Sequence, residues 1–119
     1  MPRAALWLGL VAALGCHSES RKTEAAQATV QRFFEALPSG DCAVLAPLLS
    51  SKEGDTCQAT VQELNEHSVS LVEVLDAKVD GRDPNAVMVR ARVARDGKVR
   101  EQLMLLRVER HPEGWKLRL

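Results

Sequence analysis

Aromatic residues are scarce in this chain, and tyrosine is missing altogether. The 119 residues include two phenylalanines and two tryptophans, too few to predict a platform on which nucleic-acid bases could stack. The charge balance agrees, because 16 basic residues are matched by 16 acidic ones and nucleic-acid binding normally needs a basic surface. We therefore expect no nucleic acid among the partners.

Several motifs that carry enzyme chemistry are also missing. The sequence contains neither a glycine-rich phosphate loop nor a Gly-x-Ser-x-Gly elbow. Cys42, Cys57, His67 and His111 could form a metal site on paper, but they lack the Cys-x-x-Cys or His-x-x-x-His pair that structural zinc sites normally supply. We predict no metal, no cofactor and no catalytic residue.

The N-terminus has the pattern of an export signal. Arg3 precedes an uncharged apolar run over residues 4–14, which is shorter than the roughly 20 residues that a membrane-spanning helix needs. The run ends in Ala-Leu-Gly-Cys, which resembles a bacterial lipobox, and this predicts a signal peptide over 1–15 and a lipid on Cys16. His17, rather than aspartate, favours an outer-membrane protein facing the periplasm. An ordinary secretory signal, or the first helix of a cytosolic protein, are the alternatives.

Behind this leader we expect a polar tether over 16–22 and one domain over 23–119. Helical spacing predicts a first helix over 23–37, capped by Thr23 and ended by Pro38-Ser39-Gly40. A short second helix should follow Asp41 and be interrupted at Pro47. A third should run from Thr56 to about His67. The first helix carries an apolar stripe of Ala26, Val30, Phe33, Phe34 and Leu37.

From Ser68 onward the pattern changes to strands. Four segments have strand character, over 69–80, 87–94, 99–109 and 115–119, and the mixed pattern of the first predicts a bulge or burial on both faces. Asp96-Gly97 is a strong signal for a two-residue hairpin. Helices followed by strands predict an α+β fold, with the helices packed on one face of a four-stranded antiparallel sheet.

The two ends of this region resemble a known superfamily. The segments "VQRFFEALPSGDCAVLAPLLS" and "VREQLMLLRVERHPEGWKLRL" are similar to the first helix and the last hairpin of nuclear-transport-factor-2-like, or SnoaL-like, domains. The resemblance covers about 24–119 and implies a cone in which a curved sheet wraps around the helices. Some members are isomerases or dehydratases. The tyrosine of the isomerase oxyanion hole has no counterpart here, and no motif makes His67 and Glu73 an acid–base pair.

The remaining cysteines predict a disulfide. With Cys16 used for lipid, Cys42 and Cys57 form an even pair in an oxidising compartment. Each opens a predicted helix on its apolar stripe, so the two side chains can meet across a helix–helix contact.

The hairpin also predicts which residues face outward. A two-residue turn pairs Arg95 with Lys98, and continuing this register sets Val89 opposite Met104 and Val87 opposite Leu106. The outward face then contains an Arg92–Glu101 ion pair and the apolar Leu103 and Leu105. Two interpretations are open: this face mediates a homodimer, or the terminal tether, a loop or the last strand covers it. The basic residues around the hairpin are Arg90, Arg92, Arg95, Lys98 and Arg100. We interpret them as the solvent-exposed end of the hairpin, and the alternative is that they contact an anion or a membrane surface.

These features together favour a membrane-tethered, non-catalytic lipoprotein domain of the cell envelope that binds a small apolar ligand or a protein partner. The alternatives are a small SnoaL-like pocket enzyme of the isomerase, dehydratase or hydrolase class, and a purely structural interaction module. The sequence does not identify the ligand.

Overall fold

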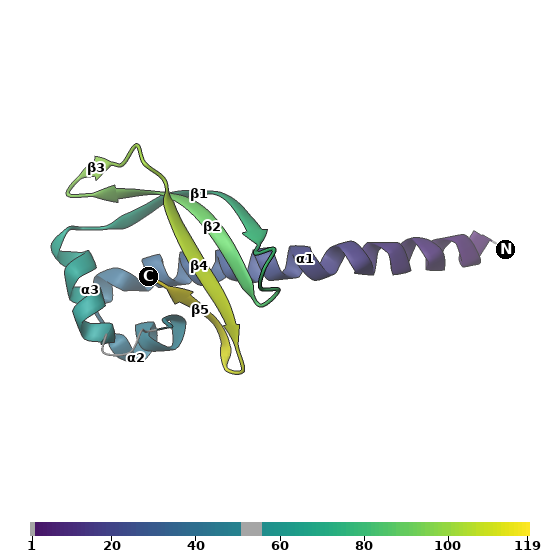
Figure 1. Ribbon diagram of the computed structural model, residues 1–119, viewed down its shortest axis with the longest axis horizontal. Helices are drawn as coiled ribbons and strands as arrows, with labels where there is room; N and C mark the ends of the chain where they lie inside the picture. Colours follow the sequence, from purple (N-terminus) through teal and green to yellow (C-terminus); the bar gives the residue numbers. More distant parts are fainter. Residues whose placement is uncertain (1, 51–55) are drawn as a thin grey trace.

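Helices come first in the chain and an antiparallel sheet follows (Figure 1). The computed structural model describes residues 2–50 and 56–119, with side chains from residue 18 onward, so the predicted signal peptide and the lipid site at Cys16 lie outside the described side chains. The helical elements are α1 (Pro2–Ala36), η1 (Leu37–Ser39), α2 (Cys42–Leu45), η2 (Ala46–Leu48) and α3 (Cys57–Glu66). The strands are β1 (Ser70–Val79), β2 (Ala86–Arg95), β3 (Lys98–Val99), β4 (Met104–His111) and β5 (Gly114–Arg118). The α+β class is therefore confirmed.

Helix α1 packs its predicted apolar stripe against the sheet, but it does not begin where Thr23 suggested. Residues 18–22 are already helical. The Thr23 hydroxyl donates to the Ser20 carbonyl at 3.0 Å instead of accepting from the first turn of a helix, so the predicted cap at Thr23 is wrong. Lys22 Nζ donates to the Pro84 carbonyl at 2.9 Å, which fastens this part of α1 to the turn between β1 and β2.

The other two predicted caps are confirmed. Asp41 Oδ1 accepts from the Ala43 N–H at 2.9 Å, and Thr56 Oγ1 accepts from the Ala59 N–H at 3.1 Å, so α2 and α3 each begin with a satisfied donor. The interruption at Pro47 is confirmed as well, because α2 ends at Leu45 and the chain tightens into the 3₁₀ turn η2.

The strands form a meander in the order β1-β2-β4-β5, with the short β3 paired to β2. Asp96 and Gly97 both have positive φ, 53° and 78°, as a type I′ hairpin turn requires. The pairing of Arg95 with Lys98 is as predicted. Ser50 N–H donates to the Leu117 carbonyl at 2.8 Å, so the segment after η2 covers the free edge of β5.

Beyond the turn, the predicted register is wrong by two residues. Val89 pairs with Leu106 and Val87 with Val108, because the chain leaves the ladder between β3 and β4. The guanidinium of Arg92 donates to the carbonyls of Arg100 and Glu101 at 3.1 and 3.4 Å, which gives this excursion hydrogen-bond partners. A shift of two residues keeps each strand residue on the same side of the sheet, so the predicted inward face survives.

Strand β1 contains two bulges, where the sequence predicted an irregularity. The register with β2 shifts between Leu71 and Glu73 and again between Val74 and Asp76. Each bulge adds one residue to the edge strand, and the extra residues Val72 and Leu75 are 47% and 41% exposed. Bulges also blunt an open sheet edge against further strand pairing.

The core fills the space between α1 and the inner face of the sheet. Phe33 and Phe34 meet edge to face with ring centroids 5.4 Å apart. Side chains from the helices and from strands β2, β4 and β5 surround them, and many are fully buried: Val30, Leu37, Leu45, Val87, Val89, Val108 and Leu117. The interior beside Phe33 is therefore occupied by the protein's own side chains.

Candidate functional site

The face of the sheet that points away from the helices carries exposed apolar side chains. Leu105 in β4 is 60% exposed and Val99 in β3 is 57% exposed. Val72 and Leu75, the extra residues of the two bulges, are also exposed. We call Val72, Leu75, Val99 and Leu105 the outer apolar patch. It is the feature of the described surface that most resembles a docking site for another protein.

Two arginines of this face are paired with carboxylates of the neighbouring strand. Arg90 forms a bidentate ion pair with Asp76, its cross-strand neighbour. Arg92 Nε lies 3.5 Å from Glu73 Oε1. The hydrogen bond from Arg90 holds the pKa of Asp76 below its usual range. Because these charges already have partners, covering the patch would not leave any of them buried without a partner.

Two expectations for this face are corrected. Arg92 pairs with Glu73 and not with Glu101, since the excursion after β3 turns only main-chain carbonyls toward its guanidinium. Leu103 is half-buried and lies in the same depression as Val93 and Met104, so it does not belong to the outer apolar patch.

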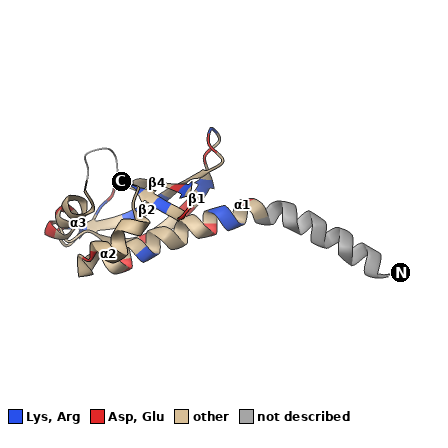
Figure 2. Cartoon of the chain, turned by 90° about the horizontal axis from the view of Figure 1, so that it is seen from below, with Lys and Arg blue, Asp and Glu red and all other residues tan. Residues whose placement is uncertain are grey.

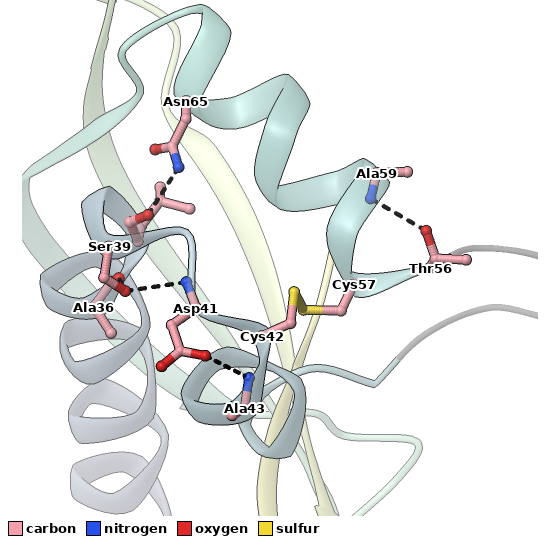
Figure 3. Close-up of a disulfide and its surroundings, with 10 residues drawn as sticks. Ala36, Ser39, Asp41, Cys42, Ala43, Thr56, Cys57, Ala59 and Asn65 are labelled. Carbon is pink, nitrogen blue, oxygen red and sulfur yellow. Dashed lines mark hydrogen bonds between the residues drawn. A yellow bond between two sulfur atoms is a disulfide. The ribbon is translucent and has the colours of Figure 1, made fainter.

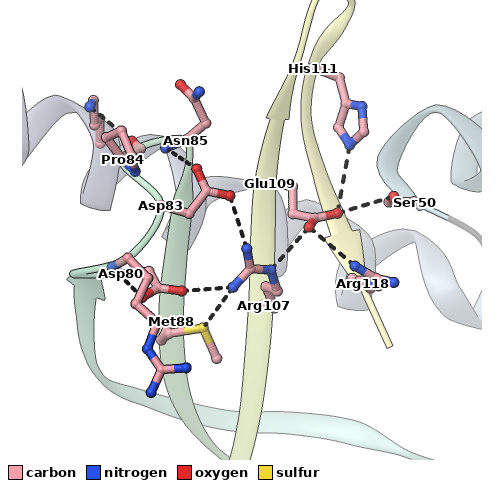
Figure 4. Close-up of polar contacts among 12 residues, drawn as sticks. Ser50, Asp80, Asp83, Pro84, Asn85, Met88, Arg107, Glu109, His111 and Arg118 are labelled. Atoms are coloured by element: carbon pink, nitrogen blue, oxygen red, sulfur yellow. Dashed lines mark hydrogen bonds and ion pairs between the residues drawn. The ribbon is translucent and has the colours of Figure 1, made fainter.

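A second charge network lies on the same face, around Arg107 of β4 (Figure 4). Its guanidinium contacts Asp80 Oδ2 at 2.8 Å, Asp83 Oδ2 at 3.0 Å and Glu109 Oε2 at 3.0 Å. Glu109 also accepts from Arg118 at 3.4 Å and from the Ser50 hydroxyl at 3.3 Å. The network connects the β1–β2 turn to β4, β5 and the segment after η2, so we assign it a structural role.

Two acidic groups of this network, Asp80 and Glu109, have lowered pKa values, which favours their charged form. The backbone N–H of Arg82 and the side chain of Arg107 hold the pKa of Asp80 below its usual range. Burial raises the pKa of Glu109, but the hydrogen bond from Arg107 and the charges of Arg118 and Arg107 outweigh it, leaving the pKa lowered.

The Cys42–Cys57 disulfide is present and joins the starts of α2 and α3 (Figure 3). The two Cα atoms are 6.1 Å apart, within the range that a disulfide bridges. This confirms the predicted pairing, and it leaves neither sulfur available as a metal ligand or nucleophile.

The structure does not bring His67 and Glu73 together as an acid–base pair. His67 Nδ1 lies 3.4 Å from Asp96 Oδ2, whereas Glu73 contacts Arg92. His111 Nε2 lies 3.8 Å from Glu109 Oε1, far along the chain from the two cysteines. Within the described residues, no three His, Cys, Asp or Glu side chains are grouped to hold a metal ion, and no helix is long and apolar enough to cross a membrane.

No protein-family model and no curated protein matches this chain. The candidate site therefore depends on the geometry of the outer face alone.

Proposed function

We propose that this chain is a membrane-tethered, non-catalytic envelope domain that binds protein through the outer apolar patch, and that its partner is a second copy of itself. The observation that carries this proposal is the exposure of Leu105, Val99, Val72 and Leu75 on one face. A packed interior around Phe33 and Phe34 favours a protein partner over a small apolar ligand held inside the domain.

Charge pairing on the face favours a symmetric partner. The two arginines Arg90 and Arg92 of β2 are neutralised by Asp76 and Glu73 of β1 within each copy, so these four charges do not oppose like charges when two identical faces meet. The apolar side chains between them then supply the attraction.

The membrane tether in this proposal is the lipid on Cys16. Its support is the apolar run over 4–14 followed by Gly15-Cys16, and the Cys42–Cys57 disulfide fits an oxidising compartment such as the periplasm. Mass spectrometry of the protein from its own membrane should find a diacylated or triacylated Cys16 and no residues 1–15. An intact Met1 terminus would exclude the anchor.

For the domain itself we propose a cone of the nuclear-transport-factor-2-like type. The order of helices before a four-strand meander supports it. The pairing of His67 with Asp96 and of Glu73 with Arg92 supports a binding role over a SnoaL-like enzyme.

The dimer is tested by sedimentation velocity of the purified chain in density-matched neutral detergent. We expect the wild type to sediment as a dimer and Leu105→Lys to sediment as a folded monomer. Val44→Lys is the matched control, because Val44 is a similarly exposed apolar residue, at 51%, but lies in α2. A monomeric wild type at high concentration, or equal dissociation by both variants, would exclude this interface.

A further inference from the structure

A cleft of about 400 Å³ lies where α1 passes the hairpin between β4 and β5. Helix α1 contributes four small or basic residues to it, and the hairpin contributes one residue from each strand. The lining residues are Ser18, Arg21, Lys22, Ala25, Arg110 and Trp115. This cleft is separate from the outer apolar patch, because it lies on the helix-covered side of the sheet.

The charge in this cleft has one sign. Arg21, Lys22 and Arg110 are cationic, and the described lining includes no carboxylate. The contrast is with Arg107, which three carboxylates surround. Figure 2 shows a blue band of basic positions on α1. Cations held around one depression create a positive potential that a bound anion would relieve.

The hydrogen-bonding state of these side chains leaves donors available. Lys22 Nζ gives one hydrogen bond, to the Pro84 carbonyl, and an ammonium group has three donors. Across residues 18–50 and 56–119, the Arg21 and Arg110 side chains form no hydrogen bond or ion pair. The Arg110 N–H is fixed to the Asn85 carbonyl at 2.7 Å, so the main chain that carries this guanidinium is held in place.

We propose that the cleft binds a phosphate-bearing anion, either as the headgroup of an anionic lipid or as a free phosphoester. Guanidinium groups donate to phosphate oxygens in a bidentate manner, and the ammonium of Lys22 and the hydroxyl of Ser18 add further donors. Trp115 forms one wall, and its indole suits the membrane–water interface at which lipid phosphates lie. The proposal depends on the cleft's own side chains and stands without a lipid on Cys16.

The test uses the full chain in neutral detergent micelles, with Trp7→Phe so that one indole N–H signal remains for nuclear magnetic resonance. Phosphatidylglycerol is titrated into the micelles in one arm, and glycerol phosphate into the water phase in the other. Phosphatidylcholine is the neutral reference. We expect the Trp115 signal to shift and saturate with at least one phosphate probe and to stay unchanged with phosphatidylcholine.

The variant Arg21→Gln/Arg110→Gln should weaken this binding by about tenfold or more, because two charge-assisted contacts are lost. The control Arg95→Gln/Arg100→Gln removes the same charge at the β2–β3 hairpin and should bind as the wild type does. Retained dispersion of the amide spectrum shows that each variant is folded.

A response to glycerol phosphate identifies a free phosphoester, and a response to phosphatidylglycerol alone identifies a lipid headgroup. No response to either probe, or equal weakening in both variants, would overturn the proposal.

Discussion

Asn65 Nδ2 donates a hydrogen bond to the main-chain carbonyl of Leu37 at 2.8 Å, joining the last turn of α3 to η1, the turn that follows α1. The Gly40 N–H donates to the same carbonyl at 3.0 Å, and Gly40 has φ +65°, a conformation that glycine adopts without strain. One carbonyl at a helix end thus receives both a local cap and a bond from a residue 28 positions away.

Removing the Asn65 amide should destabilise the protein. We expect Asn65→Ala to lower the free energy of unfolding by about 1 kcal/mol, the net value of one such hydrogen bond. Asn65→Asp should cost more, because a carboxylate would face a carbonyl oxygen at the negative end of a helix. Gln62→Ala is the control, since Gln62 is exposed and its side-chain amide donates to Glu66 in the same helix. Urea unfolding measures all three, and an Asn65→Ala variant as stable as Gln62→Ala would exclude this role.

The disulfide should be a main source of stability in this region. Cys42 and Cys57 are 15 positions apart, and closing a loop of that length is worth about 3 kcal/mol in the chain-entropy model. We expect Cys42→Ser/Cys57→Ser to lose about this much free energy of unfolding. Both proteins keep Cys16 and differ only at Cys42 and Cys57. Reductant should therefore lower the free energy of unfolding of the wild type and leave that of the double variant unchanged. The bridge would be contradicted if free-thiol titration of the denatured, unreduced wild type detected Cys42 and Cys57.

Local chemistry explains which parts of the fold the sequence predicted. Asp41 and Thr56 cap α2 and α3 through hydrogen bonds within three residues, and the Asp96-Gly97 turn depends on its own φ angles. Such features are encoded where they occur. The predicted cap at Thr23 was wrong for a related reason. A threonine hydroxyl inside a helix can donate to the carbonyl of a preceding residue as readily as it can cap the start of a helix.

The predicted strand register was wrong because the chain leaves the ladder between β3 and β4. The guanidinium of Arg92 supplies donors to the carbonyls of Arg100 and Glu101, so the chain can leave the ladder without unsatisfied groups. Nothing in the local pattern of 100–103 marks this excursion. The inward face was still predicted correctly, since the shift of two residues preserves the alternation of side chains.

The basic cleft could not be found from the sequence because its walls come from distant segments. Arg21 and Lys22 look like ordinary exposed helix charges, and Arg110 looks like part of a turn. Only the packing of α1 beside the β4–β5 hairpin brings them together with Trp115. The outer patch was predicted in part, because Leu105 follows from alternation, whereas Val72 and Leu75 depend on the bulges of β1.

The network around Arg107 should make the protein sensitive to acid. The pKa values of Asp80 and Glu109 are both lowered in the folded state, so their contribution is fully present above the unfolded-state pKa of about 4 and is lost as the pH falls through the lower folded values. We expect Arg107→Gln to reduce the free energy of unfolding at pH 7, and the difference from the wild type to shrink at about pH 3.

Arg90→Gln is the matched control, because its ion pair with Asp76 is about half exposed on both sides, and such pairs contribute little. Urea unfolding at the two pH values measures these effects. A deficit of Arg107→Gln that stayed the same at both, or an equal effect of Arg90→Gln, would show that the lowered carboxyl pKa values do not contribute to folding stability.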